Sequence, residues 1–327
     1  MPVDLVPNPQ QLLYPGDDAP YGGDPGSYQD PQYPSSPYPS DPYSPVTRTW
    51  VGGHDDHSAT FADNWSPSGA PQPGDVLNFG QGSVDVKGYD LRGDTLYVGK
   101  PGEPSANTVN LSNQAQVSVD ALQGSQPTVT FNVDGVAYAD LHNQNPSNAS
   151  YVFDLHAGAS VQSEHVDLTG SNLYLNGGMA FVNTGEVDLK SSNLYVHSDL
   201  EGTGHVQVGD QKWPGSHAEV YKSVSSGQSF DVVGQGSTFS DLYVDDPSSF
   251  GGSVKLNDGY VVLGHVQADS YSLKNDLLDL YWKGNVVDSL HVSSGGDPLT
   301  VSTVGTGVLV DNSGYGSNGV ALPVHVA

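Results

Sequence analysis

Four tyrosines of this chain stand at the centre of Leu-Tyr-Leu or Leu-Tyr-Val triplets. In Leu173-Tyr174-Leu175 and Leu194-Tyr195-Val196, strand alternation places the aliphatic side chains inside and the tyrosine outside. An outward ring stacks on a pyranose ring, and a nearby carboxylate accepts hydrogen bonds from its hydroxyls, which indicates saccharide binding. The other interpretation is that outward strand positions favour tyrosine by β-propensity alone. If the coils are in register, a tyrosine column lies beside an aspartate column. The candidate ligand-binding residues on this outward face are Tyr97, Tyr174, Tyr195, Tyr243, Asp167 and Asp188.

Carboxylate pairs are a second candidate source of chemistry, because β-helix enzymes that cleave polysaccharides carry carboxylates on adjacent coils. The pairs here are Asp245 with Asp246, and Asp279 with Asp288. Adjacent acids also occur by chance among 37 acidic residues, and only two arginines are present to assist a lyase reaction. No Gly-x-Ser-x-Gly elbow or phosphate-binding loop occurs. We therefore expect no catalytic residue and no enzyme.

The segment His54-Asp55-Asp56-His57 contains four candidate metal ligands. A Gly-flanked loop gives no fixed geometry that aims two imidazoles at one ion, so a solvated polar turn is the default interpretation. Calcium suits a chain with many carboxylates, but the calcium-binding nonapeptide is absent apart from the fragment Gly295-Gly296-Asp297. We expect no cofactor, keep Ca²⁺ as an open possibility, and assign no metal-binding residue.

Internal repetition predicts the fold. Residues 166–175 (VDLTGSNLYL) recur as residues 187–196 (VDLKSSNLYV). Each copy holds two short strands joined by a turn, and so short a unit buries its apolar face only by stacking on its neighbours. We predict an all-β, right-handed parallel β-helix, a β-solenoid with coils of about 21 residues. The alternative is a tandem of β-sandwiches. At this coil length the rod would contain roughly 13 coils.

The chain divides near residue 48. Twelve of the 23 prolines lie in residues 1–47, together with six tyrosines, six aspartates and no Lys or Arg. Such a segment cannot bury enough apolar surface to offset its ordering entropy, so residues 1–48 are predicted to form a disordered arm. Residues 49–327 are predicted to form the rod. The arm is either a solvated linker or an assembly arm that docks on a partner or a neighbouring copy. Its tyrosines recur at a regular interval, at Tyr28, Tyr33, Tyr38 and Tyr43.

The charge balance argues against several partners. Ten Lys and Arg against 37 Asp and Glu give a formal net charge of −27, which disfavours binding to nucleic acid and to anionic membranes. No cysteine is present, so disulfides and Cys-ligated metals are excluded. No apolar run is long enough to insert into a membrane as a helix. The first residues lack the features of a secretory signal peptide, which is expected to be absent or already removed.

Two segments resemble a known class of proteins. Residues 49–53 (TWVGG) and 61–79 (FADNWSPSGAPQPGDVLNF) resemble the opening segment of many bacterial autotransporter-like β-helix surface proteins. Trp50 and Trp65 would then plug the open end of the core, in a cap over residues 49–80. Residues 250–312 look like the repeat-rich ends of secreted alphaproteobacterial adhesins. Unlike autotransporters, the chain is expected to have no translocator barrel after the rod.

The rod and this resemblance imply a secreted or cell-surface location. We expect an extracellular structural or adhesive protein that self-assembles into a surface layer, fibre or biofilm matrix. The alternative is a carbohydrate-binding or carbohydrate-cleaving β-helix, such as a phage spike or a polysaccharide lyase. The expected partners are other copies of the chain, in a homo-oligomer or filament, and cell-surface polysaccharide. Strands at 301–304 and 308–310 are expected to leave the C-terminal end open for a neighbouring copy.

Overall fold

The computed structural model describes most of the chain that follows residue 45. The described residues are 46–52, 58–72, 75–79, 82–87, 90–91, 95–98, 106–112, 115–119, 121–122, 128–143, 149–213, 215–235, 237–295, 298–313 and 320–324. All of them belong to one compact unit, Ser44–Ala327. The four tyrosines of the predicted assembly arm and the His-Asp-Asp-His segment lie outside the described residues.

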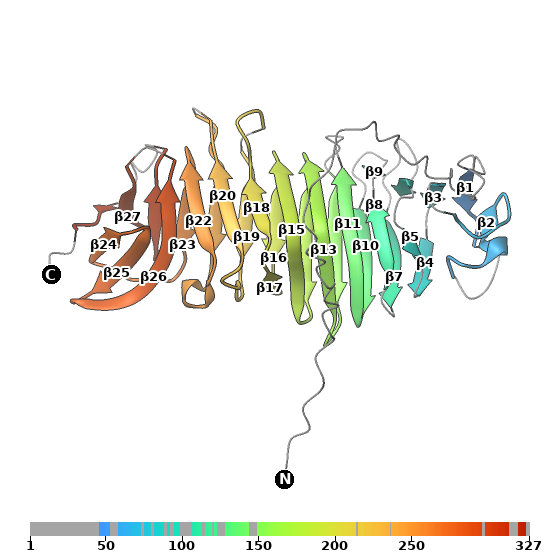
Figure 1. Ribbon diagram of the computed structural model, residues 1–327, viewed down its shortest axis with the longest axis horizontal. Helices are drawn as coiled ribbons and strands as arrows, with labels where there is room; N and C mark the ends of the chain where they lie inside the picture. Colours follow the sequence, from blue (N-terminus) through green and yellow to red (C-terminus); the bar gives the residue numbers. More distant parts are fainter. Residues whose placement is uncertain are drawn as a thin grey trace, which may run out of the picture. The chain divides into compact units, whose positions relative to one another are not determined.

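Regular structure in the described residues is almost entirely β-strand, with two short 3-10 helices, η1 (Ala62–Asn64) and η2 (Pro247–Ser249). Figure 1 shows the strands stacked side by side along the long axis of the unit, in two long sheets and one short sheet. Sheet A, the short one, contains in spatial order β2 (Trp65–Ser66), β1 (Thr47–Trp50), β3 (Val76–Phe79), β6 (Thr95–Val98) and β9 (Ala121–Leu122).

Sheet B consists of a parallel stack followed by three antiparallel strands. The parallel strands are β4 (Gly82–Lys87), β7 (Ala106–Ser112), β10 (Thr128–Asp134), β12 (Ser150–Leu155), β14 (Asn172–Gly177), β16 (Asn193–Val196), β19 (His217–Val220), β21 (Asp241–Val244) and β23 (Tyr260–Leu263). The antiparallel strands are β28 (Gly307–Asp311), β27 (Thr300–Val304) and β29 (Val320–Ala321).

Sheet C has the same organisation, a parallel stack that ends in antiparallel strands. The parallel strands are β5 (Asp90–Leu91), β8 (Gln116–Val119), β11 (Val136–Asn143), β13 (Ser160–Thr169), β15 (Ala180–Lys190), β18 (His205–Val208), β20 (Ser229–Val233), β22 (Ser253–Asn257) and β26 (Asn285–Ser294). The antiparallel strands are β25 (Leu277–Trp282) and β24 (Ser270–Lys274), while β17 (Asp199–Gly202) pairs with β15 beside this path.

Successive strands of each long sheet lie one coil apart in the sequence. Leu175 of β14 pairs with Val196 of β16, its counterpart in the internal repeat. The number of residues between paired positions on neighbouring strands is larger for β4 and β7, and smaller for β21 and β23, than for β14 and β16. The outermost coils are therefore less regular. The fold is a β-solenoid of about six coils with turns of about 22 residues. This confirms the parallel β-helix predicted from the internal repeat.

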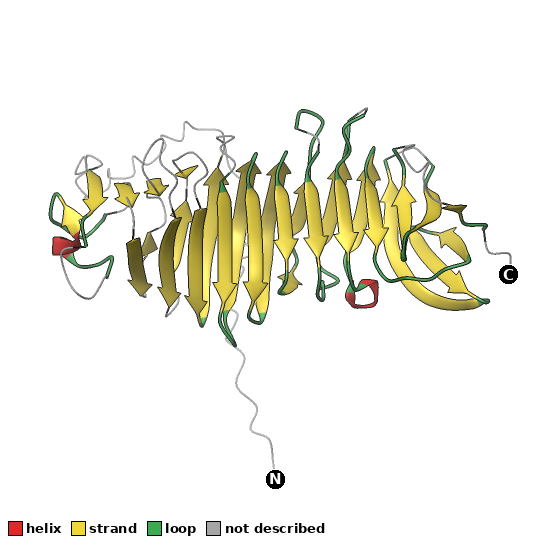
Figure 2. Ribbon diagram, turned by 180° about the vertical axis from the view of Figure 1, so that it is seen from behind, coloured by secondary structure: helices red, strands yellow, loops and turns green. Residues whose placement is uncertain are grey.

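The apolar core lies between the two long sheets, which face each other in Figures 1 and 2. In β14 and β16, buried and partly exposed residues alternate, as the period-two sequences require. Phe131 of β10 and Phe153 of β12 stack inside, with ring centroids 4.7 Å apart. Because apolar burial contributes about 25 cal/mol per Å², each coil is stabilised by the coils that cover it.

Buried serines connect the coils at the corner that precedes four sheet-B strands. Ser171, Ser192, Ser216 and Ser240 come directly before β14, β16, β19 and β21, and none is more than 2% exposed. The backbone N–H of Ser192 donates to Oγ of Ser216, and that of Ser216 donates to Oγ of Ser240, both at 3.2 Å. The serine ladder satisfies backbone donors that are shielded from water and holds the register of the outward residues.

The N-terminal end of the core is covered by an antiparallel strand pair. Trp50 of β1 lies opposite Trp65 of β2, with the ring centroids 5.1 Å apart in an edge-to-face arrangement. The two residues are 9% and 2% exposed and belong to the core. Arg48 Nε donates to Asp75 Oδ2 at 2.6 Å in a buried ion pair. The two tryptophans therefore pack against each other within the buried apolar cluster.

The C-terminal end differs from the open edge that the sequence predicted. β27 and β28 contain the strands at 301–304 and 308–310, and they form a hairpin that pairs antiparallel with β23. In sheet C, β24, β25 and β26 form a similar antiparallel meander. The predicted open end was wrong because these strands turn back on the last coil. The strands at both ends thus do not continue the repeating coils. For this reason the solenoid has about six coils and not the larger number predicted.

Candidate functional site

The outward residues of four sheet-B strands form a grid of three columns, which we call the tyrosine face. β14, β16, β19 and β21 pair in register, so each coil places alternate residues outside. The third column lies within β14 on the first coil and directly after the strand on the other three, where backbone hydrogen bonds to the preceding coil keep the register. Coil by coil, the outward triplets are Asn172, Tyr174 and Asn176; Asn193, Tyr195 and His197; His217, Glu219 and Tyr221; and Asp241, Tyr243 and Asp245.

Aromatic rings run through this grid. Tyr174 and Tyr195 stack with ring centroids 4.8 Å apart and an interplanar angle of 7°. In the third column His197 stacks on Tyr221 at 4.2 Å and 14°. Tyr221 in turn lies 6.4 Å from Tyr243, at a tilt of 57°. The face therefore carries aromatic rings on four successive coils, and these rings stack chiefly on one another.

A hydrogen-bonded cluster joins the middle of the face. His217 lies between two carboxylates, with Nδ1 2.6 Å from Asp241 Oδ2 and Nε2 2.7 Å from Glu219 Oε1. The hydroxyl of Tyr221 donates to the other oxygen of Glu219. Both oxygens of Glu219 are thus already engaged, and the cluster fixes the orientation of the adjacent ring.

The charges of this cluster follow from its contacts. Burial disfavours a charge on His217, but the hydrogen bonds to Asp241 and Glu219 outweigh it and raise the pKa of His217 to about 9. Burial also raises the pKa of Glu219, but the hydrogen bonds from Tyr221 and His217 lower it overall. The hydrogen bond to Glu219 raises the pKa of Tyr221 to about 12. At neutral pH a charged imidazole therefore lies between two carboxylates, beside a neutral phenol.

Three of the four predicted tyrosines, Tyr174, Tyr195 and Tyr243, lie on the tyrosine face, each between buried neighbours. Glu219 interrupts their column between the second and the third. Tyr97 belongs to β6 of sheet A, so its inclusion in the same column was wrong. The triplet pattern identifies an outward position, but it does not identify the sheet.

The predicted aspartates lie on sheet C, across the core from the tyrosines, so the expectation of neighbouring columns was wrong. Asp167 is 8% exposed and accepts a hydrogen bond from Lys190 Nζ at 2.8 Å. Burial and the charge of Glu186 raise the pKa of Asp188. These carboxylates are partly shielded and lie in a mixed column. In register order it reads Asp167, Asp188, Gln207, Asp231 and Lys255.

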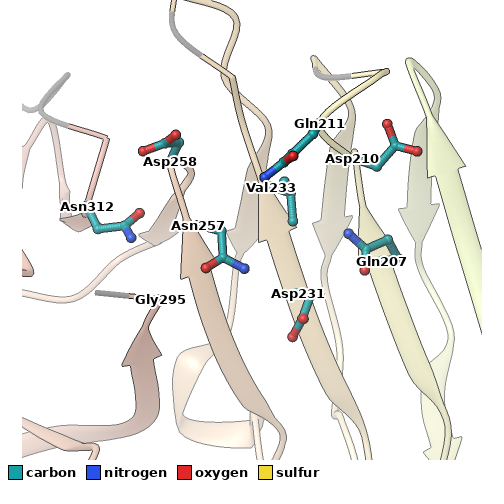
Figure 3. A pocket seen from close by; sticks show the side chains of 9 residues that line it. All are labelled: Gln207, Asp210, Gln211, Asp231, Val233, Asn257, Asp258, Gly295 and Asn312. Carbon is teal, nitrogen blue, oxygen red and sulfur yellow. The ribbon is translucent and has the colours of Figure 1, made fainter. Parts of the chain in front are cut away.

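An open groove of about 480 Å³ continues this column towards the C-terminal end. Figure 3 shows its side chains on β18, β20 and β22 and on the loops beyond them. Some of its polar groups are already used, since Asn312 Nδ2 donates to Leu256 O at 2.8 Å. None of the lining residues is aromatic, so the groove offers hydrogen bonds without a stacking surface. The lining residues are Gln207, Asp210, Gln211, Asp231, Val233, Asn257, Asp258, Gly295 and Asn312.

The structure separates one predicted carboxylate pair and adds a residue to the other. Asp279 of β25 lies opposite Ser289, the neighbour of Asp288 in β26, so alternation places the two carboxylates on opposite faces. Asp279 and Asp288 therefore do not form the candidate pair. Asp288 instead lines one pocket together with the other pair, Asp245 and Asp246.

This second pocket, which we call the Trp282 pocket, has a volume of about 360 Å³ and adjoins the tyrosine face. The hydroxyl of Tyr243 donates to Asp245 Oδ1 at 3.0 Å, and His265 Nε2 lies 3.2 Å from the same oxygen. Asp245 thus belongs to both surfaces. The lining residues are Asp245, Asp246, Pro247, Ser248, Gly264, His265, Val266, Gln267, Trp282, Val287 and Asp288.

Sequence reasoning missed most residues of the tyrosine face, among them His197, His217, Glu219 and Tyr221. A signal was present, because residues 217–220 (HAEV) and 241–244 (DLYV) share the alternation and pair in register. Their coil is longer than the internal repeat, so a search for copies at the period of that repeat does not align them.

The described residues contain no group of three or more His, Asp or Glu arranged to hold a metal ion. Within the same residues, no helix has the length and apolar character needed to cross a membrane. Comparison of the chain with protein-family models, curated proteins and solved structures gives no match. Function is therefore inferred from the molecule's own surfaces.

Proposed function

We propose that the chain is a structural or adhesive protein of the cell surface that binds a polysaccharide along the tyrosine face. One observation supports this most strongly: aromatic rings lie on four successive coils of a single sheet, with carboxylates and carboxamides in the adjacent columns. Rings that stack on one another form a rigid ladder whose edges and hydroxyl groups can contact a glycan, and the polar columns supply hydrogen bonds to hydroxyls.

The dimensions of the face suit an extended chain rather than a small ligand. Parallel strands lie about 4.8 Å apart, so the four coils present binding groups over roughly 15 Å. The spacing of one coil is similar to the length of one pyranose unit in an extended glycan. Because the rings are held by the coil register and by the His217 cluster, little ordering entropy is lost on binding.

The same contacts support binding rather than cleavage on this face. Glycoside hydrolysis needs one carboxyl group free to donate a proton and a second free to attack or to activate water. Glu219 accepts hydrogen bonds on both oxygens, and Asp241 is bound to the charged His217. Both carboxylates are engaged within the cluster, and this supports a binding role for the face.

A secreted or cell-surface location and self-assembly belong to the same proposal. The closed C-terminal end changes how copies would meet, since neither β27 nor β28 is left unpaired for a neighbour. Contacts between copies would instead use the lateral faces or the residues before 46. The formal charge of −27 opposes such contacts unless salt or divalent cations screen it.

The experiment is a binding assay with a panel of soluble and insoluble polysaccharides, which compares the full chain with a Tyr174→Ala/Tyr195→Ala double variant. Loss of two stacked anchors should weaken binding at least about tenfold. The matched control is Tyr138→Ala, which removes a partly exposed tyrosine from β11 of sheet C. Equal binding by the double variant and the wild type, or an equal loss in the control, would contradict the proposal.

A further inference from the structure

The Trp282 pocket is strongly acidic. Three carboxylates line it, those of Asp245, Asp246 and Asp288, and the described lining residues include no Lys or Arg. His265 is the one described lining residue able to carry a positive charge, and its side chain is 68% exposed and already beside Asp245. The three carboxylates of the pocket therefore outnumber the positive charges beside them, which are those that His265 and the neighbouring Lys283 can carry.

The pKa of Asp288 reflects the excess of negative charge in the pocket. Burial raises its pKa, the charge of Asp246 raises it further, and a backbone hydrogen bond from Ser289 only partly offsets them. Asp288 Oδ2 is shielded from water and has no hydrogen-bond partner among the described residues. Asp246, by contrast, is held ionised at the rim, where hydrogen bonds from Ser248 and Ser249 lower its pKa. A cation in this pocket would relieve the repulsion between the acids.

An aromatic ring forms part of the wall of the Trp282 pocket. Trp282 lines the pocket, and indole is the side chain that binds cations best through its π face. Lys283 Nζ lies 5.4 Å from the ring centroid, so a ligand ammonium would compete with this lysine for the indole. Carboxylates and an indole together form a site suited to an ammonium group.

The pocket is continuous with the tyrosine face. Asp245 is the third-column residue of the fourth coil, and it also accepts the hydrogen bond from Tyr243. A Cβ placed on Gly264, another lining residue, would lie 2.6 Å from the hydroxyl of Tyr243, so the tyrosine reaches the edge of the pocket. A glycan that follows the rings would therefore present its next unit to the acidic pocket.

We propose that the polysaccharide bound by this chain carries free amino groups, and that the Trp282 pocket binds one of its ammonium groups between Asp245, Asp246 and the indole of Trp282. This assignment rests on the proposed function and names its ligand class. The same acidity, together with the net charge of the chain, disfavours glycans built from uronic acids or carrying sulfate.

The test is isothermal titration calorimetry of the full chain with three oligosaccharides of equal length. One is a glucosamine hexamer, one the N-acetylated hexamer, and one a galacturonate hexamer. At about pH 6 the free amines carry charge. The glucosamine hexamer should bind at least about tenfold more tightly than its N-acetylated form, the preference expected for a charge-assisted contact. The galacturonate hexamer should not bind.

Two variants test whether the Trp282 pocket causes the preference for the glucosamine hexamer. Asp246→Asn removes an exposed carboxylate from the pocket and should lower the preference for the amine about tenfold, with the affinity for the N-acetylated hexamer unchanged. Trp282→Ala should weaken the binding of the glucosamine hexamer. The control is Asp258→Asn, which removes the same charge from an exposed position in the sheet-C groove and should leave all three affinities unchanged.

The outcomes distinguish a failure of this inference from a failure of the proposed function. If the amine and N-acetylated hexamers bind equally, or if Asp246→Asn retains the full preference, the inference is overturned while polysaccharide binding stands. If no oligosaccharide or polysaccharide of any class binds, the proposed function fails and the inference fails with it. A preference for the galacturonate hexamer would contradict the charge argument directly.

Discussion

The His217 cluster predicts how the stability of the solenoid changes with pH. The pKa of His217 is about 9 in the folded chain and 6.5 for an unperturbed histidine. A group whose pKa is raised on folding stabilises the folded state fully below its unfolded pKa. That stabilisation is lost as the pH rises through the folded pKa. The sensitive window is therefore between about pH 6.5 and pH 9.

The magnitude follows from the same two values. A pKa of about 9 against 6.5 corresponds to about 3 kcal/mol of stabilisation of the charged form. The His217 side chain is 26% exposed, so solvent screening lowers the expected effect to about 2 kcal/mol. Tyr221, with a pKa of about 12, keeps its proton and its hydrogen bond to Glu219 throughout the window.

The assay is urea unfolding, followed by circular dichroism, of the wild type and of His217→Gln at about pH 6 and about pH 9.5. Glutamine keeps a donor for one carboxylate but carries no charge. The free energy of unfolding of the wild type should fall by about 2 kcal/mol more than that of the variant. The difference between the two proteins cancels the titration of every group that they share. Parallel pH profiles of wild type and variant would refute the reasoning.

Three further predictions concern the ladder, the arm and assembly. Ser216→Ala leaves the buried N–H of Ser192 without its acceptor and should destabilise the solenoid by about 1–3 kcal/mol, whereas Ser226→Ala, at an exposed position, should change thermal stability little. Mild proteolysis should trim residues 1 to about 47 and leave a resistant core. A fully protected arm in the monomer would contradict the linker interpretation. Light scattering should detect oligomers that grow with salt, Ca²⁺ or Mg²⁺ and weaken when residues 1–47 are deleted; a monomer under all conditions would exclude self-assembly.

The parallel β-helix was predictable because two neighbouring coils have kept nearly the same sequence. Residues 166–175 and 187–196 differ little, and identical spacing within each copy places Tyr174 in register with Tyr195. The number of coils was not predictable from them. Coil length varies where loops such as residues 209–216 are inserted, and the terminal strands pair antiparallel without any repeat.

The site was predictable only in part for a related reason. Alternation identifies which residues point outward, but the partner coil and the sheet depend on loop lengths that leave no periodic signal. Asp167 was therefore placed beside the tyrosines, although its strand belongs to the opposite sheet. His217 and Glu219 were missed because their coil kept the alternation and lost the tyrosine. The Trp282 pocket brings together loops and a hairpin far apart in sequence, which no local pattern indicates.

The most direct test of the central claim is hydroxyl-radical footprinting of the full chain with and without a polysaccharide that it binds. The measured quantity is the oxidation rate of each tyrosine, read by mass spectrometry. The account predicts protection of Tyr174, Tyr195 and Tyr221 on the tyrosine face, with Tyr138 on sheet C unprotected. Protection of Tyr138 alone, or binding without protection of any tyrosine of the face, would contradict it.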